Sequence, residues 1–173
     1  RDYYTHIKGN GEDKVTLMVY MVGSDLESDG GAASEDIAEM TAANADNINI
    51  TLQTGGAAAW ENASISDGKT ERHIIKNGEL QNVENLGEAQ MTSPNTLTDF
   101  IKWSASNYPA DRYELVHWNH GGGTALGFGY DEMYPDDMLS LSQIGNALSD
   151  SGIKFDIVGF DACLMGCHRS EER

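Results

Sequence analysis

The amino-acid sequence predicts an α/β domain built on a mostly parallel sheet. The first observation is a strand–helix–strand order within residues 15–54, which is typical of a βαβ unit with a right-handed crossover. The second is a pair of short apolar runs, residues 113–118 and 155–160, that are both followed by reactive polar residues. Buried parallel strands have this composition, and α/β folds place their chemistry at the carboxyl ends of such strands.

The first predicted unit begins with a buried strand over residues 15–22, which stops at Gly23-Ser24-Asp25. Residues 34–47 have helical spacing of apolar side chains, and Ser34 is the expected N-cap. Residues 48–54 form the next predicted strand and run into two glycines. This unit implies a parallel sheet because the helix carries the chain back to the starting edge.

A change of pattern between residues 60 and 87 predicts a β-hairpin. Its strands are expected over residues 73–76 and 79–83, joined by Asn77-Gly78, the pair favoured where both turn residues need a positive φ. We expect this hairpin to be an excursion from the main sheet.

The remaining elements alternate between helix and strand. Ser93 as cap and Pro94 at the first helical position predict a helix that Pro109 closes. After the apolar run 113–118 comes a polar loop over residues 127–138, and then a capping box, Ser140-Leu-Ser-Gln143, which opens a helix that Gly152 ends. The last predicted strand follows and leads to Cys163.

Length, composition and net charge limit the classes of protein to which this chain can belong. A chain of 173 residues with 39% hydrophobic residues can form one domain, expected here over residues 1–173. The formal charge of −17 argues against binding to nucleic acid or to anionic membranes, and permits a basic substrate. Most of the carboxylates are expected on a solvated surface. No apolar run is long enough to span a membrane.

His120 and Cys163 follow the two matched strands, so neighbouring strands would deliver both to one edge of the sheet. A histidine or a helix start beside a thiol, whose usual pKa is about 8.5, makes the thiol a nucleophile. Gly121 and the two glycines after it leave backbone N–H groups that can stabilise an oxyanion. Asp161 points to the same side as Cys163, where it could orient the histidine or bind a cation. His117, in mid-strand, is expected to be a hydrogen-bonded core residue.

The sequence motifs around His120 and Cys163 resemble those of a known family. His120-Gly121 after one strand and Asp161-Ala-Cys163 after the next resemble the paired motifs of caspase-like cysteine peptidases, and the first strand and turn resemble the clostripain family within that group. The resemblance covers most of the chain from Val15 to Gly166. It implies a caspase-like three-layer α/β sandwich with a mostly parallel central sheet.

The resemblance also implies a peptidase that cuts after Arg or Lys through a thioester. Carried over by position, Cys163 is the nucleophile, His120 is the acid/base, the Gly121 backbone belongs to the oxyanion site and Asp161 binds the basic side chain. The expected partners are peptide or protein substrates with Arg or Lys at the cut site, and the protein is expected to be exported, to the extracellular space, the periplasm or the cell surface. The family's sheet continues past the nucleophile, so we expect the domain to be truncated there and to need a further C-terminal segment or chain.

No cofactor or metal is expected from the residues, although some members of the resembled family need calcium. Calcium could use hard oxygen ligands from the polar loop, but these lack the regular spacing of a calcium-binding loop. The candidate ligands are Asp131, Glu132, Asp136 and Asp137. Cys163 and Cys167 make a poor closed metal site even with the histidine that follows them.

The sequence leaves other functions open. A non-catalytic or degenerate caspase-like module that binds peptides or a partner is the main alternative. An α/β-hydrolase esterase would explain the His-Gly-Gly-Gly sequence, but the chain has no G-x-S-x-G elbow. A redox role for Cys163 and Cys167 is disfavoured because they are not spaced as C-x-x-C.

Overall fold

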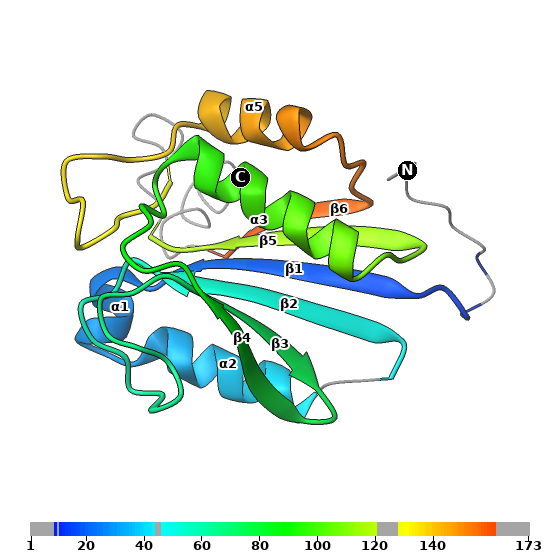
Figure 1. Ribbon diagram of the computed structural model, residues 1–173, viewed down its shortest axis with the longest axis horizontal. Helices are drawn as coiled ribbons and strands as arrows, with labels where there is room; N and C mark the ends of the chain where they lie inside the picture. The colour runs from blue at the N-terminus through cyan, green and yellow to red at the C-terminus, as the bar shows by residue number, and fades with distance from the viewer. Residues whose placement is uncertain (1–8, 10, 44–45, 121–127, 162–173) are drawn as a thin grey trace, which may run out of the picture.

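A six-stranded sheet forms the centre of the molecule in the computed structural model, which describes residues 9, 11–43, 46–120 and 128–161 (Figure 1). The strand order across the sheet is β4-β3-β2-β1-β5-β6. The β1, β2, β5 and β6 strands are parallel, whereas β3 and β4 are antiparallel to their neighbours. Their bounds are Val15–Val22 (β1), Ile48–Gly55 (β2), Glu71–Lys76 (β3), Glu79–Asn85 (β4), Arg112–Trp118 (β5) and Ile157–Asp161 (β6).

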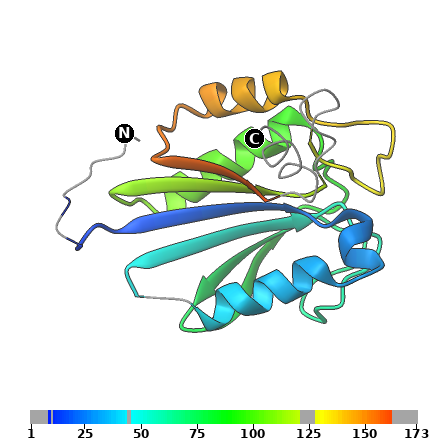
Figure 2. The same cartoon turned by 180° about the vertical axis from the view of Figure 1, so that it is seen from behind.

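Helices cover both faces of the sheet and produce three layers (Figures 1 and 2). On one face, α2 packs Ala33 and Ile37 against apolar side chains of β1 and β2. On the other face, α3 and α5 pack against the opposite side chains of β1 and β5. The helices are α1 (Ser24–Ser28), α2 (Ala32–Ala42), α3 (Pro94–Asn107) and α5 (Leu141–Ser151). The predicted three-layer sandwich with a mostly parallel sheet is therefore confirmed.

The central strand β1 is buried on both faces, as its continuous apolar composition predicts. Met18, Tyr20 and Val22 enter the core beneath α3, while Val19 and Met21 enter the core beneath α2. Each of these side chains is at most 3% exposed. Burial on both sides ties the two helical layers to a single strand.

The predicted starts of α3 and α5, which rest on capping residues and a proline, are confirmed. Pro94 opens α3 and Ser93 is its N-cap, although the Ser93 side chain makes no capping hydrogen bond. The predicted capping box of α5 is present, with the Ser140 side chain accepting from the Gln143 backbone and Gly152 ending the helix at φ 70°.

The prediction for α2 is wrong at both ends. The helix begins at Ala32 after a left-handed Gly31 cap, and it ends at Ala42 rather than Asn47. Ser34 is not the N-cap but lies inside the first turn, where its N–H and its hydroxyl donate to the Glu27 carboxylate at 2.8 and 2.5 Å. A carboxylate from a neighbouring helix thus takes the place of the expected local cap.

The hairpin is present, but the expectation that it lies apart from the main sheet is wrong. Asn77 and Gly78 adopt φ values of 54° and 73°, as the predicted turn requires. However, β3 pairs antiparallel with β2, with Ile75 opposite Ile50. The β3 strand carries apolar residues that need cover, whereas β4 is polar and mostly exposed, which suits the edge of a sheet.

Two histidines are buried in this core. His117 is 1% exposed and packs against Tyr20. Neither of its ring nitrogens has a hydrogen-bond partner among the described residues, so the expected hydrogen-bonded role is wrong. His73 is 0% exposed, and in the described part of the chain its ring bonds only Thr54, at 2.9 Å through Nε2. Burial lowers the pKa of each to about 4; for His73 the nearby Glu71 carboxylate opposes the shift.

We predict that the free energy of unfolding falls as the pH falls from about 6.5 towards 4. The folded pKa of each histidine lies below the unfolded value, so the unfolded chain binds more protons in this window. The upper limit is about 3 kcal/mol for each histidine. Denaturant unfolding at several pH values measures this dependence, and His117→Phe and His73→Gln should each reduce it. An unchanged dependence in the double variant would contradict the assignment.

Candidate active site

His120 lies just beyond the carboxyl end of β5, as predicted. Its side chain is 32% exposed. The His120 N–H donates to the Asn119 side-chain oxygen, and the His120 carbonyl accepts from the Gly129 N–H at 3.3 Å. These hydrogen bonds help to hold His120 at this edge of the sheet.

The ring of His120 contacts Asp25, which sequence reasoning missed. His120 Nε2 and Asp25 Oδ1 are 2.5 Å apart. Because an ionised carboxylate can only accept, Nε2 is the donor in this contact. Asp25 lies in α1, directly after β1, and β1 pairs in parallel with β5. Parallel strands of α/β folds place functional residues at their carboxyl ends. This rule applies to the first strand as well as to residues 113–118 and 155–160, and it could have identified the Asp25 carboxylate.

The turn that leads from β1 to Asp25 has an unusual backbone. Ser24 is completely buried and has a φ of 53°, a conformation that non-glycine residues rarely adopt. The Gly23 and Ser24 N–H groups donate to the carbonyls of Gly55 and Gly56 at 2.8 and 3.1 Å. A Cβ on Gly23 would lie 3.0 Å from the Cβ atoms of Ala57 and Glu27. The path of the chain into α1 is thus fixed by its neighbours.

Glu27 connects this turn to two other segments. Its side chain is completely buried, and its carboxylate accepts from Ser34 as described above and from the Glu61 N–H at 2.8 Å. Glu61 lies in the loop that follows β2. Glu27 therefore joins α1, the start of α2 and this loop through charge-assisted hydrogen bonds.

Asp161 is the last residue of β6 and is exposed. It is opposite Trp118 in the parallel register of β5 and β6, and its carbonyl accepts from the Asn119 N–H at 3.1 Å. The structure thus brings the ends of the two matched strands together, with His120 two residues beyond β5 and Asp161 as the last residue of β6. Gly121, Cys163 and Cys167 lie outside the described residues, so their roles stay predictions.

The acidic residues of the polar loop are largely engaged with the protein itself. Asp131 is 1% exposed, and its carboxylate accepts from the Met91 and Met133 N–H groups, both at 2.9 Å. Burial raises the pKa of Asp131 despite these hydrogen bonds. Glu132 accepts from the Ala58 N–H at 2.6 Å and from the Ser28 hydroxyl at 2.9 Å. These two carboxylates attach the loop to α1, to the loop after β2 and to the segment before α3.

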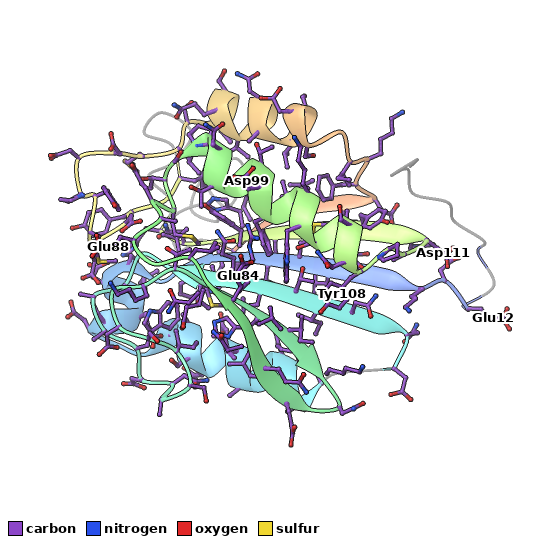
Figure 3. All side chains as sticks on the ribbon, viewed as in Figure 1. Glu12, Glu84, Glu88, Asp99, Tyr108 and Asp111 are labelled. Atoms are coloured by element: carbon purple, nitrogen blue, oxygen red, sulfur yellow. The ribbon has the colours of Figure 1, made fainter. Side chains whose placement is uncertain are left out.

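No cluster of three His, Cys, Asp or Glu side chains suited to a metal ion occurs in the part of the chain that the structure describes. Other carboxylates lie on the outer surface. Figure 3 labels the exposed side chains of Glu12, Glu84, Glu88 and Asp99, of which Glu84 and Glu88 lie at and just beyond the end of β4. Within the described ranges, no helix is long and apolar enough to cross a membrane.

Comparison with known proteins identifies relatives of this chain. The sequence profile of the Clostripain family matches residues 19–169. Clostripain from Hathewaya histolytica is 30% identical over 189 aligned residues, which cover 91% of this chain and 35% of that protein. The chain thus spans about a third of the length of the curated relative that it matches.

Solved structures share the fold at lower identity. A secreted C11 cysteine protease from Bacteroides thetaiotaomicron, in complex with an irreversible peptide inhibitor, superposes with a TM-score of 0.69 at 21% identity, covering 88% of this chain and 43% of that chain. An inactive zymogen C11 protease from Parabacteroides distasonis superposes with a TM-score of 0.60 at 23% identity, covering 87% and 42%.

These similarities agree with the caspase-like arrangement of the sheet and its two helical layers. The family match covers nearly all of the chain from the middle of β1 to beyond β6. The chain belongs to the clostripain family.

Proposed function

We propose that this chain carries the catalytic residues of a cysteine endopeptidase that cleaves after Arg or Lys. The observation that carries the proposal is the parallel pairing of β5 and β6, which end beside each other at His120 and Asp161. Cys163 follows Asp161 by two residues in the sequence. The 30% identity to clostripain supports the same assignment.

In the proposed reaction His120 takes the proton of the Cys163 thiol, and the resulting thiolate adds to the carbonyl carbon of the scissile peptide bond. The backbone N–H of Gly121 contributes to the site that stabilises the resulting oxyanion. The carbon–nitrogen bond then breaks, and His120 gives a proton to the departing amine, leaving a thioester on Cys163. A water molecule, deprotonated by His120, hydrolyses the thioester and releases the thiol.

Specificity for a basic residue would come from Asp161. Its position beside the end of β5 and its exposure suit a carboxylate that pairs with a guanidinium or ammonium group. The net charge of −17 favours the approach of basic substrates.

We further propose that the protein acts outside the cell on peptide or protein substrates. The similarity to a protease described as secreted supports this location.

The mechanism needs no cofactor. Calcium remains a proposal for this chain, to be tested by adding and chelating it in the activity assay.

The nucleophile assignment predicts different outcomes for the two cysteines. Cys163→Ala should reduce turnover of an Arg-containing peptide at least 1,000-fold, because it removes the attacking atom. Cys167→Ala, the matched control, should stay within about threefold of the unchanged protein. A thiol-reactive peptide ketone that ends in Arg should label Cys163, as mapped by mass spectrometry. Equal loss in both variants would contradict a single nucleophile, and absence of labelling would favour a non-catalytic peptide-binding module.

The assignment of Asp161 predicts a selective loss. Asp161→Asn should lower kcat/KM for Arg and Lys substrates by about 10- to 100-fold, because it removes the charge partner of the substrate. Substrates with a neutral residue at the same position should change little. Asp150→Asn removes an equal charge from the exposed surface of α5 and serves as the control. An equal loss on basic and neutral substrates would make Asp161 structural.

A further inference from the structure

We infer that Asp25 is the positioning residue of His120 in the proposed peptidase reaction. The inference rests on the proposed function and adds a third side chain, from the first strand of the sheet, to the predicted pair of His120 and Cys163. In this arrangement Asp25 accepts a hydrogen bond from Nε2 of the imidazole. The other ring nitrogen, Nδ1, is then the one that exchanges a proton with the thiol and the departing amine.

The geometry of the contact supports a defined tautomer. His120 Nε2 and Asp25 Oδ1 are 2.5 Å apart, which places them in hydrogen-bonding contact. A hydrogen bond to a carboxylate is charge-assisted. A neutral imidazole has one protonated and one unprotonated nitrogen, and the partner of one nitrogen sets the state of the other. With the hydrogen held on Nε2 by Asp25, the lone pair is on Nδ1. A histidine that acts as base needs its lone pair in one known position.

The protein fixes the position of Asp25 as well as that of His120. Asp25 directly follows Ser24, whose left-handed conformation is held by the hydrogen bonds of the Gly23–Ser24 turn to the end of β2. Left-handed conformations at non-glycine residues are often found at functional sites, where the surrounding structure maintains them. On the other side, buried Glu27 attaches α1 to α2 and to the loop after β2. The carboxylate of Asp25 is thus carried by a short segment that is anchored at both ends.

A role in stability alone does not account for this contact. The side chains of His120 and Asp25 are 32% and 48% exposed, and neither residue belongs to an apolar core cluster. Ion pairs at this level of exposure contribute little to folding, since solvent screens them and ordering the side chains costs entropy. The anchored turn therefore holds a pair whose benefit lies in the orientation of the ring.

The first experiment measures kcat and KM for an Arg-containing peptide with the natural protein that contains this chain. Asp25→Ala should lower kcat about 100-fold with KM within about twofold, because orientation of the base affects the chemical step. Asp25→Asn keeps the shape and one acceptor oxygen and should retain more activity than Asp25→Ala. Asp29→Ala removes an equal charge from the end of the same helix and should leave kcat unchanged. An unchanged kcat in Asp25→Ala, with an active parent protein, would overturn the inference and leave the proposed function intact.

A double variant separates positioning from a general structural effect. In a His120→Ala background, Asp25→Ala should cause no further loss of the residual rate, because the ring that it orients is absent. A second loss of about 100-fold in that background would show that Asp25 acts independently of His120 and would overturn the inference.

A spectroscopic readout makes the test independent of activity. Nitrogen-15 NMR of the neutral His120 ring should show the hydrogen on Nε2 in the parent protein and a mixture of tautomers in Asp25→Ala. The same tautomer populations in both proteins would overturn the inference. If the parent protein has no thiol-dependent turnover, the proposed function fails, while the NMR comparison still decides whether Asp25 sets the state of the ring.

Discussion

The parallel pairing of β1 with β5, and of β5 with β6, is the constraint on which the candidate site depends. In this register Met21 lies opposite Trp118, and Trp118 lies opposite Asp161, so the three strands end together. The residues that follow them therefore meet at one edge of the sheet, although they are far apart in the sequence. The rigid centre of β1, buried between two helical layers, holds this edge in place. The site is in this sense a property of the sheet and not of any single loop.

Carboxylates fix the loops at this edge. Glu27, Asp131 and Glu132 each accept hydrogen bonds from backbone N–H groups of other segments. A hydrogen bond to a carboxylate is stronger than one to a neutral acceptor. These carboxylates also provide partners for backbone N–H groups that apolar packing alone would leave unpaired. Part of the large negative charge is consequently structural, in addition to the exposed carboxylates that were expected from the composition.

Sequence patterns predicted the features that depend on local chemistry. The β1 strand, the Pro94 start of α3, the capping box at Ser140 and the Asn77-Gly78 turn all have signals within a few residues. The errors concern features that depend on distant residues. The local sequence favours Ser34 as a cap, but its partner is the Glu27 carboxylate, which no local pattern indicates. The place of the hairpin depends on its pairing with β2. The contact of His120 with Asp25 joins residues 95 positions apart, through a five-residue helix too short to show a periodic pattern.

The central position of β1 also has a consequence for how the chain folds during synthesis. The β1 strand is synthesised before β5, one of its two neighbours, and the hydrogen bond of the Lys14 N–H to Asp111 joins residues that are 97 positions apart. Until β5 leaves the ribosome, one edge of the most apolar strand has no partner. Long-range parallel pairing of this kind slows folding and exposes apolar surface in the meantime. We expect the sheet to close around β1 only after β5 has been synthesised.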